Sequence, residues 1–154
     1  MAFKNTLFIL FTCIGLHHLS AQTTNVWYDD LEVASKVAYK SDKPIMLFFT
    51  GSDWCGWCIR LQKEVFQQEA FKQWAADNVI LVELDFPSKK VLPAKIKEQN
   101  QMLQQQFAVR GYPTCWFVSV VKNGEVFNLE RLGQSGYMAG GPEPWITNAK
   151  TFLK

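Results

Sequence analysis

Two cysteines separated by two residues carry the clearest reactive chemistry in this sequence. They lie in the segment Trp54-Cys55-Gly56-Trp57-Cys58. Cysteines at this spacing can close a small disulfide ring without a large movement of the backbone. The pair follows an apolar run over residues 45–49 and opens a helical pattern. Backbone N–H groups at a helix N-terminus favour a thiolate, so we expect Cys55 to attack a substrate disulfide. Cys58, one turn further in and more buried, would then release the partner.

Two other interpretations of the same pair involve no exchange chemistry. The cysteines could form an inert structural disulfide, or they could be half of a zinc site. A closed zinc site needs four ligands, and beyond residue 21 the chain has one further cysteine, Cys115. Both histidines, His17 and His18, lie before that point, which also argues against a Cys–His hydrolase. We therefore expect no metal and no bound organic cofactor, and only the disulfide itself as the redox group.

The first residues are typical of a secretory signal peptide. Lys4 is followed by an apolar run over residues 6–16, and Ala21 offers a small residue for cleavage before Gln22. A membrane-spanning helix needs about 20 apolar residues, which makes an uncleaved anchor a poor alternative. A lipid anchor on Cys13 is also disfavoured, because that residue lies inside the apolar run. We expect residues 1–21 to be removed, and residues 22–154 to work in the periplasm or outside the cell, where disulfides persist.

The composition is that of one globular domain without a nucleic-acid-binding character. The chain of 154 residues is 48% hydrophobic, 14% aromatic and 19% charged, with a net charge of +2. These values exclude a disordered or collagen-like chain, and no clustered basic face suggests nucleic acid. The basic stretch over residues 87–97 is interpreted as a solvated loop, although it could instead steer an acidic partner.

Hydrophobic periodicity predicts an α/β fold. Residues 45–49 and 79–84 are predicted to be buried strands that lie parallel, because a helical segment joins them. Asn123-Gly124 predicts a tight hairpin, and a short extra strand is expected near residues 26–27. The remaining predictions are helices over 29–41, 55–74 with a break near 67, and 99–107, antiparallel strands over 115–121 and 126–131, and a last helix from Pro142.

The cysteine segment resembles the active-site motif of thioredoxins, with Trp57 where thioredoxin itself has proline. Gly111-Tyr112-Pro113-Thr114 resembles the second signature of that family, whose proline follows a cis peptide bond, and Gly133 its later glycine. The approach over residues 48–54 resembles a secreted bacterial branch, which is related to the C-terminal domain of the transmembrane periplasmic disulfide reductase. The resemblance implies a thioredoxin fold, a central mixed sheet of four to five strands flanked by helices. It also implies that a supporting set contacts substrate around the cysteines: Trp54, Gly56, Trp57, Tyr112, cis-Pro113 and Thr114.

The activity implied by this resemblance is thiol–disulfide exchange. The chain would be an oxidoreductase that acts on exported proteins with cysteines or disulfides. It would be recycled by a membrane redox partner and would work as a monomer. We favour reduction, because the approach to the motif resembles the reducing branch. A disulfide oxidase or isomerase of the same fold, and a redox-inert binding module, remain the alternatives.

One position departs from the family pattern. Many thioredoxins carry a buried aspartate six residues before the first cysteine, and Phe49 stands at that position. Candidates to replace this acid are Glu64, Glu83 and Asp85, although a solvated or loop role is expected for each. Asp53 is interpreted as a turn residue, and Cys115 as a small buried hydrophobic residue.

Overall fold

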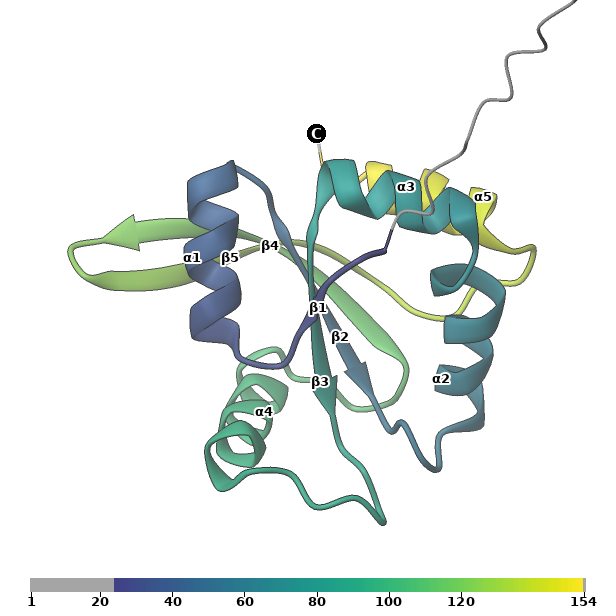
Figure 1. Cartoon of the computed structure of the whole chain (residues 1–154), viewed down its shortest axis with the longest axis horizontal. Helices are drawn as coiled ribbons and strands as arrows, with labels where there is room; N and C mark the ends of the chain where they lie inside the picture. The colour runs from purple at the N-terminus through teal and green to yellow at the C-terminus, as the bar shows by residue number, and fades with distance from the viewer. Residues whose placement is uncertain (1–23, 154) are drawn as a thin grey trace, which may run out of the picture.

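A five-stranded mixed sheet forms the centre of the computed structural model, which describes residues 24–153 (Figure 1). The strand order is β1-β3-β2-β4-β5. β2 is parallel to β3, as expected, and β3 to β1, whereas β4 is antiparallel to β2 and to β5. The strands span Trp27–Tyr28 (β1), Ile45–Thr50 (β2), Ile80–Asp85 (β3), Thr114–Asn123 (β4) and Val126–Ser135 (β5). The predicted α/β class and mixed sheet are therefore confirmed, whereas the predicted signal peptide over residues 1–21 lies outside the described residues.

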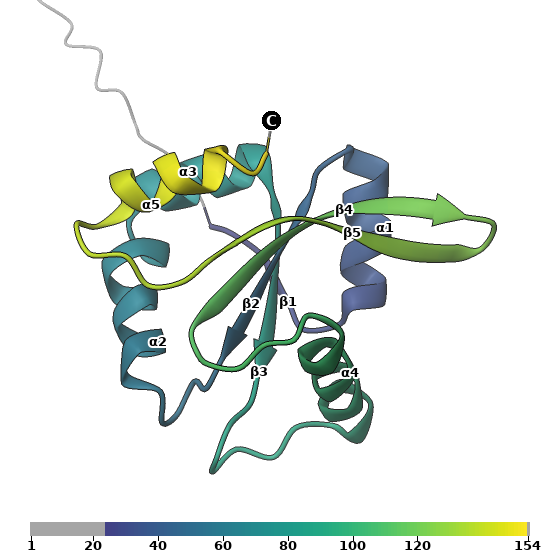
Figure 2. The same cartoon turned by 180° about the vertical axis from the view of Figure 1, so that it is seen from behind.

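Helices cover both faces of this sheet. α1 and α4 lie on one side, and α2, α3 and α5 lie on the other (Figures 1 and 2). Within residues 24–153, no helix is both long and apolar enough to cross a membrane. The helices span Leu31–Ser41 (α1), Gly56–Leu61 (α2), Glu69–Asn78 (α3), Ala94–Gln106 (α4) and Pro142–Lys150 (α5). α2 continues directly into a π-helical turn over Gln62–Phe66, and the predicted break near residue 67 is present.

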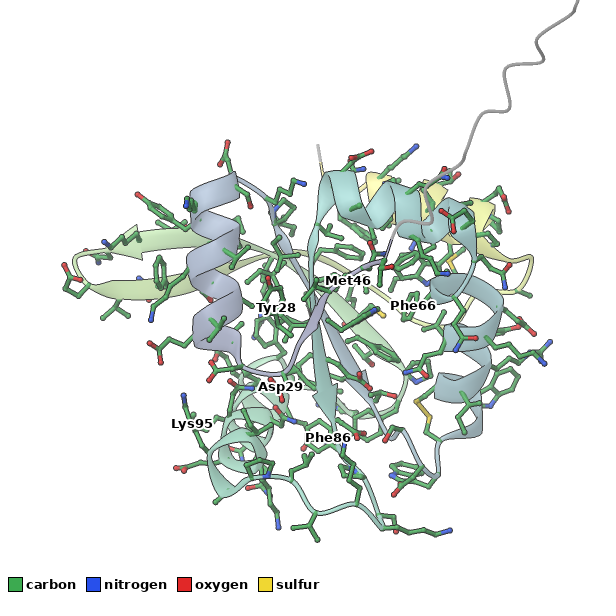
Figure 3. The ribbon with its side chains drawn as sticks, in the orientation of Figure 1. Tyr28, Asp29, Met46, Phe66, Phe86 and Lys95 are labelled. Atoms are coloured by element: carbon green, nitrogen blue, oxygen red, sulfur yellow. A yellow bond between two sulfur atoms is a disulfide. The ribbon has the colours of Figure 1, made fainter. Side chains whose placement is uncertain are left out.

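The alternation of side chains along β2 explains the two layers of the core. All six residues of β2 are buried, because a strand covered on both faces has no solvent side. Met46 and Phe48 pack with Leu61 of α2 and Trp145 of α5. The intervening side chains, Leu47 and Phe49 among them, pack into the opposite cluster with α1 and α4. Figure 3 shows Met46 and Phe66 on the α2 side of the sheet.

The helix predicted over 99–107 begins earlier, at Ala94. The lysines and the two prolines of residues 87–97 predict a loop over the whole stretch, and this prediction is wrong for residues 94–97. Pro93 is the N-cap of α4, a position where a missing N–H costs nothing. Lys95 in the first turn lies against the positive end of the helix dipole, but its Nζ is 2.8 Å from the Asp30 carboxylate. That acid, itself the N-cap of α1, offsets the unfavourable charge.

Gly133 in β5 marks a close approach between the sheet and the end of the chain. A Cβ atom at this position would lie 2.2 Å from the Phe152 ring, which packs against the Trp145 side of the core. Only glycine fits there without displacing the ring. The antiparallel pair β4–β5 is also longer than predicted, with Asn123 opposite Val126 at its tip.

Two positions on α2, separated by one residue, allow a matched test of which face of α2 packs against the core. Leu61 is fully buried, whereas Ile59 is 49% exposed. We expect Leu61→Ala to lower the free energy of unfolding by about 3 kcal/mol, because it removes buried methyl groups and leaves a cavity. Ile59→Ala is expected to change it by less than about 0.5 kcal/mol. Urea unfolding followed by circular dichroism measures both, and equal effects would contradict the assigned orientation of α2.

Candidate active site

The structure contains a disulfide between Cys55 and Cys58 at the start of α2, drawn as a yellow bond in Figure 3. Cys55 is the N-cap residue of α2, and its Sγ accepts a hydrogen bond from the backbone N–H of Cys58 at 3.2 Å. A donor aimed at Sγ would stabilise a thiolate on that atom after reduction. Cys55 is 6% exposed and Cys58 is 0% exposed. Of the two cysteines, Cys55 is therefore the more exposed residue.

The turn between β2 and Cys55 is hydrogen-bonded to the end of β3. Ser52 donates two hydrogen bonds to the Asp85 carboxylate, from its backbone N–H at 2.9 Å and from its hydroxyl at 2.6 Å. Asp85 is 7% exposed, and its backbone carbonyl accepts from the Asn100 side chain of α4 at 2.9 Å. The carboxylate thus fixes the turn against the sheet.

Asp53, interpreted from the sequence as a turn residue, also binds the loop that follows β3. Its carboxylate accepts hydrogen bonds from three consecutive backbone N–H groups, those of Ser88, Lys89 and Lys90, at 2.8, 2.7 and 3.3 Å. These bonds, led by that of Ser88, lower the pKa of Asp53 below its ordinary value. The loop after β3 is therefore fastened to the residue two positions before Cys55. No pattern of residue types indicates this contact, because the groups that bind Asp53 are backbone N–H groups.

Trp54 lies over the same turn. Its indole Nε1 donates to the Phe86 carbonyl at 2.8 Å, and its ring packs edge-on against Tyr112 at 5.8 Å between centroids. A Cβ atom on Gly51 would lie 2.4 Å from the Trp54 ring, so glycine is needed beneath it. Trp54 is nevertheless 52% exposed. It forms a fixed aromatic surface next to Cys55.

The second segment of the site precedes β4. The peptide bond between Tyr112 and Pro113 is cis. Tyr112 packs against Phe86 as well as Trp54, and its hydroxyl accepts from the Gln104 side chain at 2.6 Å. Burial raises the pKa of Tyr112, so it remains a neutral phenol. The Thr114 hydroxyl donates to the Gly111 carbonyl at 2.8 Å, a bond within the segment. The packing of Tyr112 on Trp54 holds the segment against the turn before the cysteines.

Comparison with known proteins agrees with this arrangement. A family model described as a thioredoxin-like domain matches residues 31–138. The chain belongs to the thioredoxin-like family. It is 34% identical over 130 residues to the disulfide bond reductase DsbH of Chlamydia pneumoniae, covering 84% of this chain and 74% of that protein. The thioredoxin-like domain is therefore that of a thiol–disulfide oxidoreductase related to DsbH.

Solved structures give the same fold. A structure titled DsbH oxidoreductase matches with a TM-score of 0.77 and 30% identity, covering 92% of this chain and 94% of that one. The oxidised C-terminal domain of Neisseria meningitidis DsbD matches with a TM-score of 0.52 and 19% identity, covering 81% and 97%. This second likeness shows the shared fold alone. The predicted resemblance to the thioredoxin-like family is confirmed.

The three candidate acids of this thioredoxin-like domain lie in different surroundings. Asp85 holds Ser52, as described above. The Glu64 carboxylate accepts from Arg60 Nε and from the Tyr137 hydroxyl, both at 2.7 Å, and the Arg60 bond leads in lowering its pKa. Glu83 is half-buried, and burial, followed by the charge of Asp85, raises its pKa. The pKa values of Glu64 and Glu83 are therefore shifted in opposite directions.

Phe49 does not occupy the position that a helper acid would need in this chain. It packs in the cluster with α1 and α4, on the far side of the sheet from the disulfide. Phe48 shares the disulfide's face, and its register partner on the parallel strand β3 is Glu83. Glu83 and Phe48 also line a cavity of about 240 Å³ together with Gln62, one helical turn after Cys58.

Cys115 lies in the same cluster as the disulfide but is closed to solvent. It pairs with Phe48 across the sheet, is 0% exposed, and has a free thiol. Burial raises its pKa strongly, so the thiol stays protonated and unreactive. The interpretation of Cys115 as a small buried hydrophobic residue agrees with this placement.

The Asp53 contact can be tested through the amide groups that it binds. We expect Asp53→Ala to speed hydrogen exchange at Ser88, Lys89 and Lys90 by about tenfold, because their common acceptor is lost. In the unchanged protein the protection should persist at pH 5. It should disappear only below the ordinary aspartate pKa of about 3.9, since the pKa of Asp53 is lowered. Heteronuclear NMR measures this exchange.

Asp77→Ala is the matched control, because Asp77 is an exposed acid on α3. It should leave the three amide groups unchanged. Equal exchange rates in the two variants would show that Asp53 does not hold the loop.

Proposed function

We propose that this protein reduces disulfides in exported proteins, with Cys55 as the attacking residue and Cys58 as the resolving residue. The observation that carries the assignment is the unequal exposure of the two cysteine residues, with Cys55 at the N-cap of α2. An incoming disulfide can reach Cys55 but not Cys58. The direction is supported by the similarity to DsbH of Chlamydia pneumoniae, a disulfide bond reductase.

The exchange proceeds through one mixed disulfide. The Cys55 thiolate attacks one sulfur of the substrate disulfide, and the other substrate sulfur leaves as a thiolate that takes a proton. The Cys58 thiol loses its proton and attacks Cys55 Sγ, which releases the second substrate thiol. Two electrons pass to the substrate, and the chain is left with the Cys55–Cys58 disulfide. The exchange itself requires no metal or bound organic cofactor.

Two further parts of the proposal concern location and recycling. The predicted signal peptide over residues 1–21 supports an exported compartment. A protein in such a compartment has no access to cytoplasmic NADPH, so we infer that a membrane redox partner returns two electrons to the disulfide. Trp54, Gly56, Trp57, Tyr112, Pro113 and Thr114 would surround the bound substrate.

Trapping of the mixed disulfide tests the order of the two cysteines. Cys58→Ser should accumulate covalent adducts with cysteine-containing proteins, because the adduct on Cys55 has no resolving thiol. Cys55→Ser should form none, since Cys58 is closed to solvent. Non-reducing electrophoresis after acid quenching measures the adducts.

Cys115→Ser is the matched control for these two variants, because it also removes one thiol. It should keep full exchange activity. Adducts on the Cys55→Ser variant, or loss of exchange in Cys115→Ser, would show that the roles are assigned wrongly.

The redox potential tests the direction of electron flow. We expect the Cys55–Cys58 couple to equilibrate near the thioredoxin value of about −270 mV, rather than near the value of about −120 mV for a dedicated disulfide donor. Titration in glutathione buffers, read by alkylation and mass spectrometry, gives the potential. A value near that of a donor would contradict reduction and favour an oxidase.

A further inference from the structure

Trp57, the residue between Gly56 and Cys58, is held in place by a network that the exchange reaction does not use. Its ring packs against Tyr137 with 5.0 Å between centroids. The Arg60 guanidinium lies over both rings, 5.5 Å from the centre of Trp57 and 5.2 Å from that of Tyr137. Contacts of this kind stabilise an aromatic ring in one orientation.

Glu64 stabilises this network through hydrogen bonds to two of its members. Its two carboxylate oxygens are used separately, Oε1 by Arg60 and Oε2 by the Tyr137 hydroxyl. Tyr137 lies in the segment after β5, whereas Arg60 and Glu64 lie on the helix of the cysteines. The network therefore ties Trp57 to a second part of the chain, and it neutralises the Arg60 charge internally.

The free surface of this arrangement is apolar. Trp57 is 56% exposed, and Trp54, on the other side of Cys55 in the sequence, is 52% exposed. Asp53 and Glu64, the acids nearest to these residues in sequence, already bind groups of the chain itself. Tryptophan side chains are enriched at protein interfaces. A fixed aromatic ring also loses little conformational entropy when a partner packs on it.

We propose that Trp57, held by Arg60, Glu64 and Tyr137, is a binding ledge that selects substrate segments with an aromatic or large apolar side chain next to the reactive cysteine. This inference rests on the proposed function, because Trp57 is two residues from Cys55, the residue that the substrate must reach. The occupant is an apolar side chain rather than an acid, since the Arg60 charge is already satisfied by Glu64. Arg60, Glu64 and Tyr137 act as positioning residues for Trp57.

The experiment compares three disulfides offered to the reduced full chain. The first is a symmetric peptide dimer with Phe beside its cysteine, the second has Ser in place of Phe, and the third is hydroxyethyl disulfide. We expect the second-order rate constant for the Phe dimer to exceed that for the Ser dimer by about tenfold, the scale of one aromatic contact, about 1.4 kcal/mol. Liquid chromatography of acid-quenched samples gives each rate.

Variants test whether the preference for Phe comes from the ledge. Trp57→Ala should bring the Phe-to-Ser ratio close to one, and Tyr137→Phe, which keeps the ring but loses the bond to Glu64, should give an intermediate ratio. The ratio is the chosen readout because a change in thiol reactivity affects both peptides alike. Tyr39→Phe is the matched control, since Tyr39 packs on Phe127 at the distant hairpin, and it should keep the full preference.

The outcomes separate the two proposals. A chain that reduces none of the three disulfides contradicts the proposed function and the ledge with it. A chain that reduces all three but shows no preference for Phe contradicts the ledge alone. Retention of the full preference by Trp57→Ala would also overturn the ledge, because the selectivity would then come from other residues.

Discussion

The hydrogen bonds that fasten the turn between β2 and α2 are the constraint on which the site depends. β2 is buried along its whole length, and Cys58, eight residues after the end of β2, is also buried. Cys55 must nevertheless reach solvent between these two buried elements. The Asp85 carboxylate anchors Ser52, and the Asp53 carboxylate anchors the loop after β3. A turn fixed at both residues can present one sulfur while the other stays covered.

Features that depend on local sequence could be predicted, and features that depend on distant partners could not. The buried strand at 45–49, the helix from Cys55 and the Asn123-Gly124 hairpin follow from apolar runs and turn chemistry. The contacts of Ser52, Asp53 and Trp54 join residues separated by 32 to 37 positions. Their acceptors or donors are largely backbone groups, which any sequence supplies, so no pattern of residue types indicates them.

The comparison with the thioredoxin motif also shows why counting along a strand can mislead. Phe49 matches the family's acid by its distance from Cys55, but side chains alternate between the faces of a strand. Here Phe48, not Phe49, shares the disulfide's face. The half-buried acid on that face comes from the neighbouring strand, at Glu83 opposite Phe48. A search for a helper acid therefore has to follow the sheet register and not the sequence alone.

Trp57, the second of the two residues between the cysteines, also depends on distant parts of the chain. Where thioredoxin has proline, the ring itself restricts the backbone, whereas Trp57 has no such internal restriction. Its orientation must come from neighbours, and these are Arg60 on the next turn and Tyr137 beyond β5. The helix of the cysteines is consequently linked to the end of an edge strand through Glu64. Rigidity at this position is thus supplied by tertiary contacts, and those contacts leave the Trp57 ring more than half exposed, two residues from Cys55.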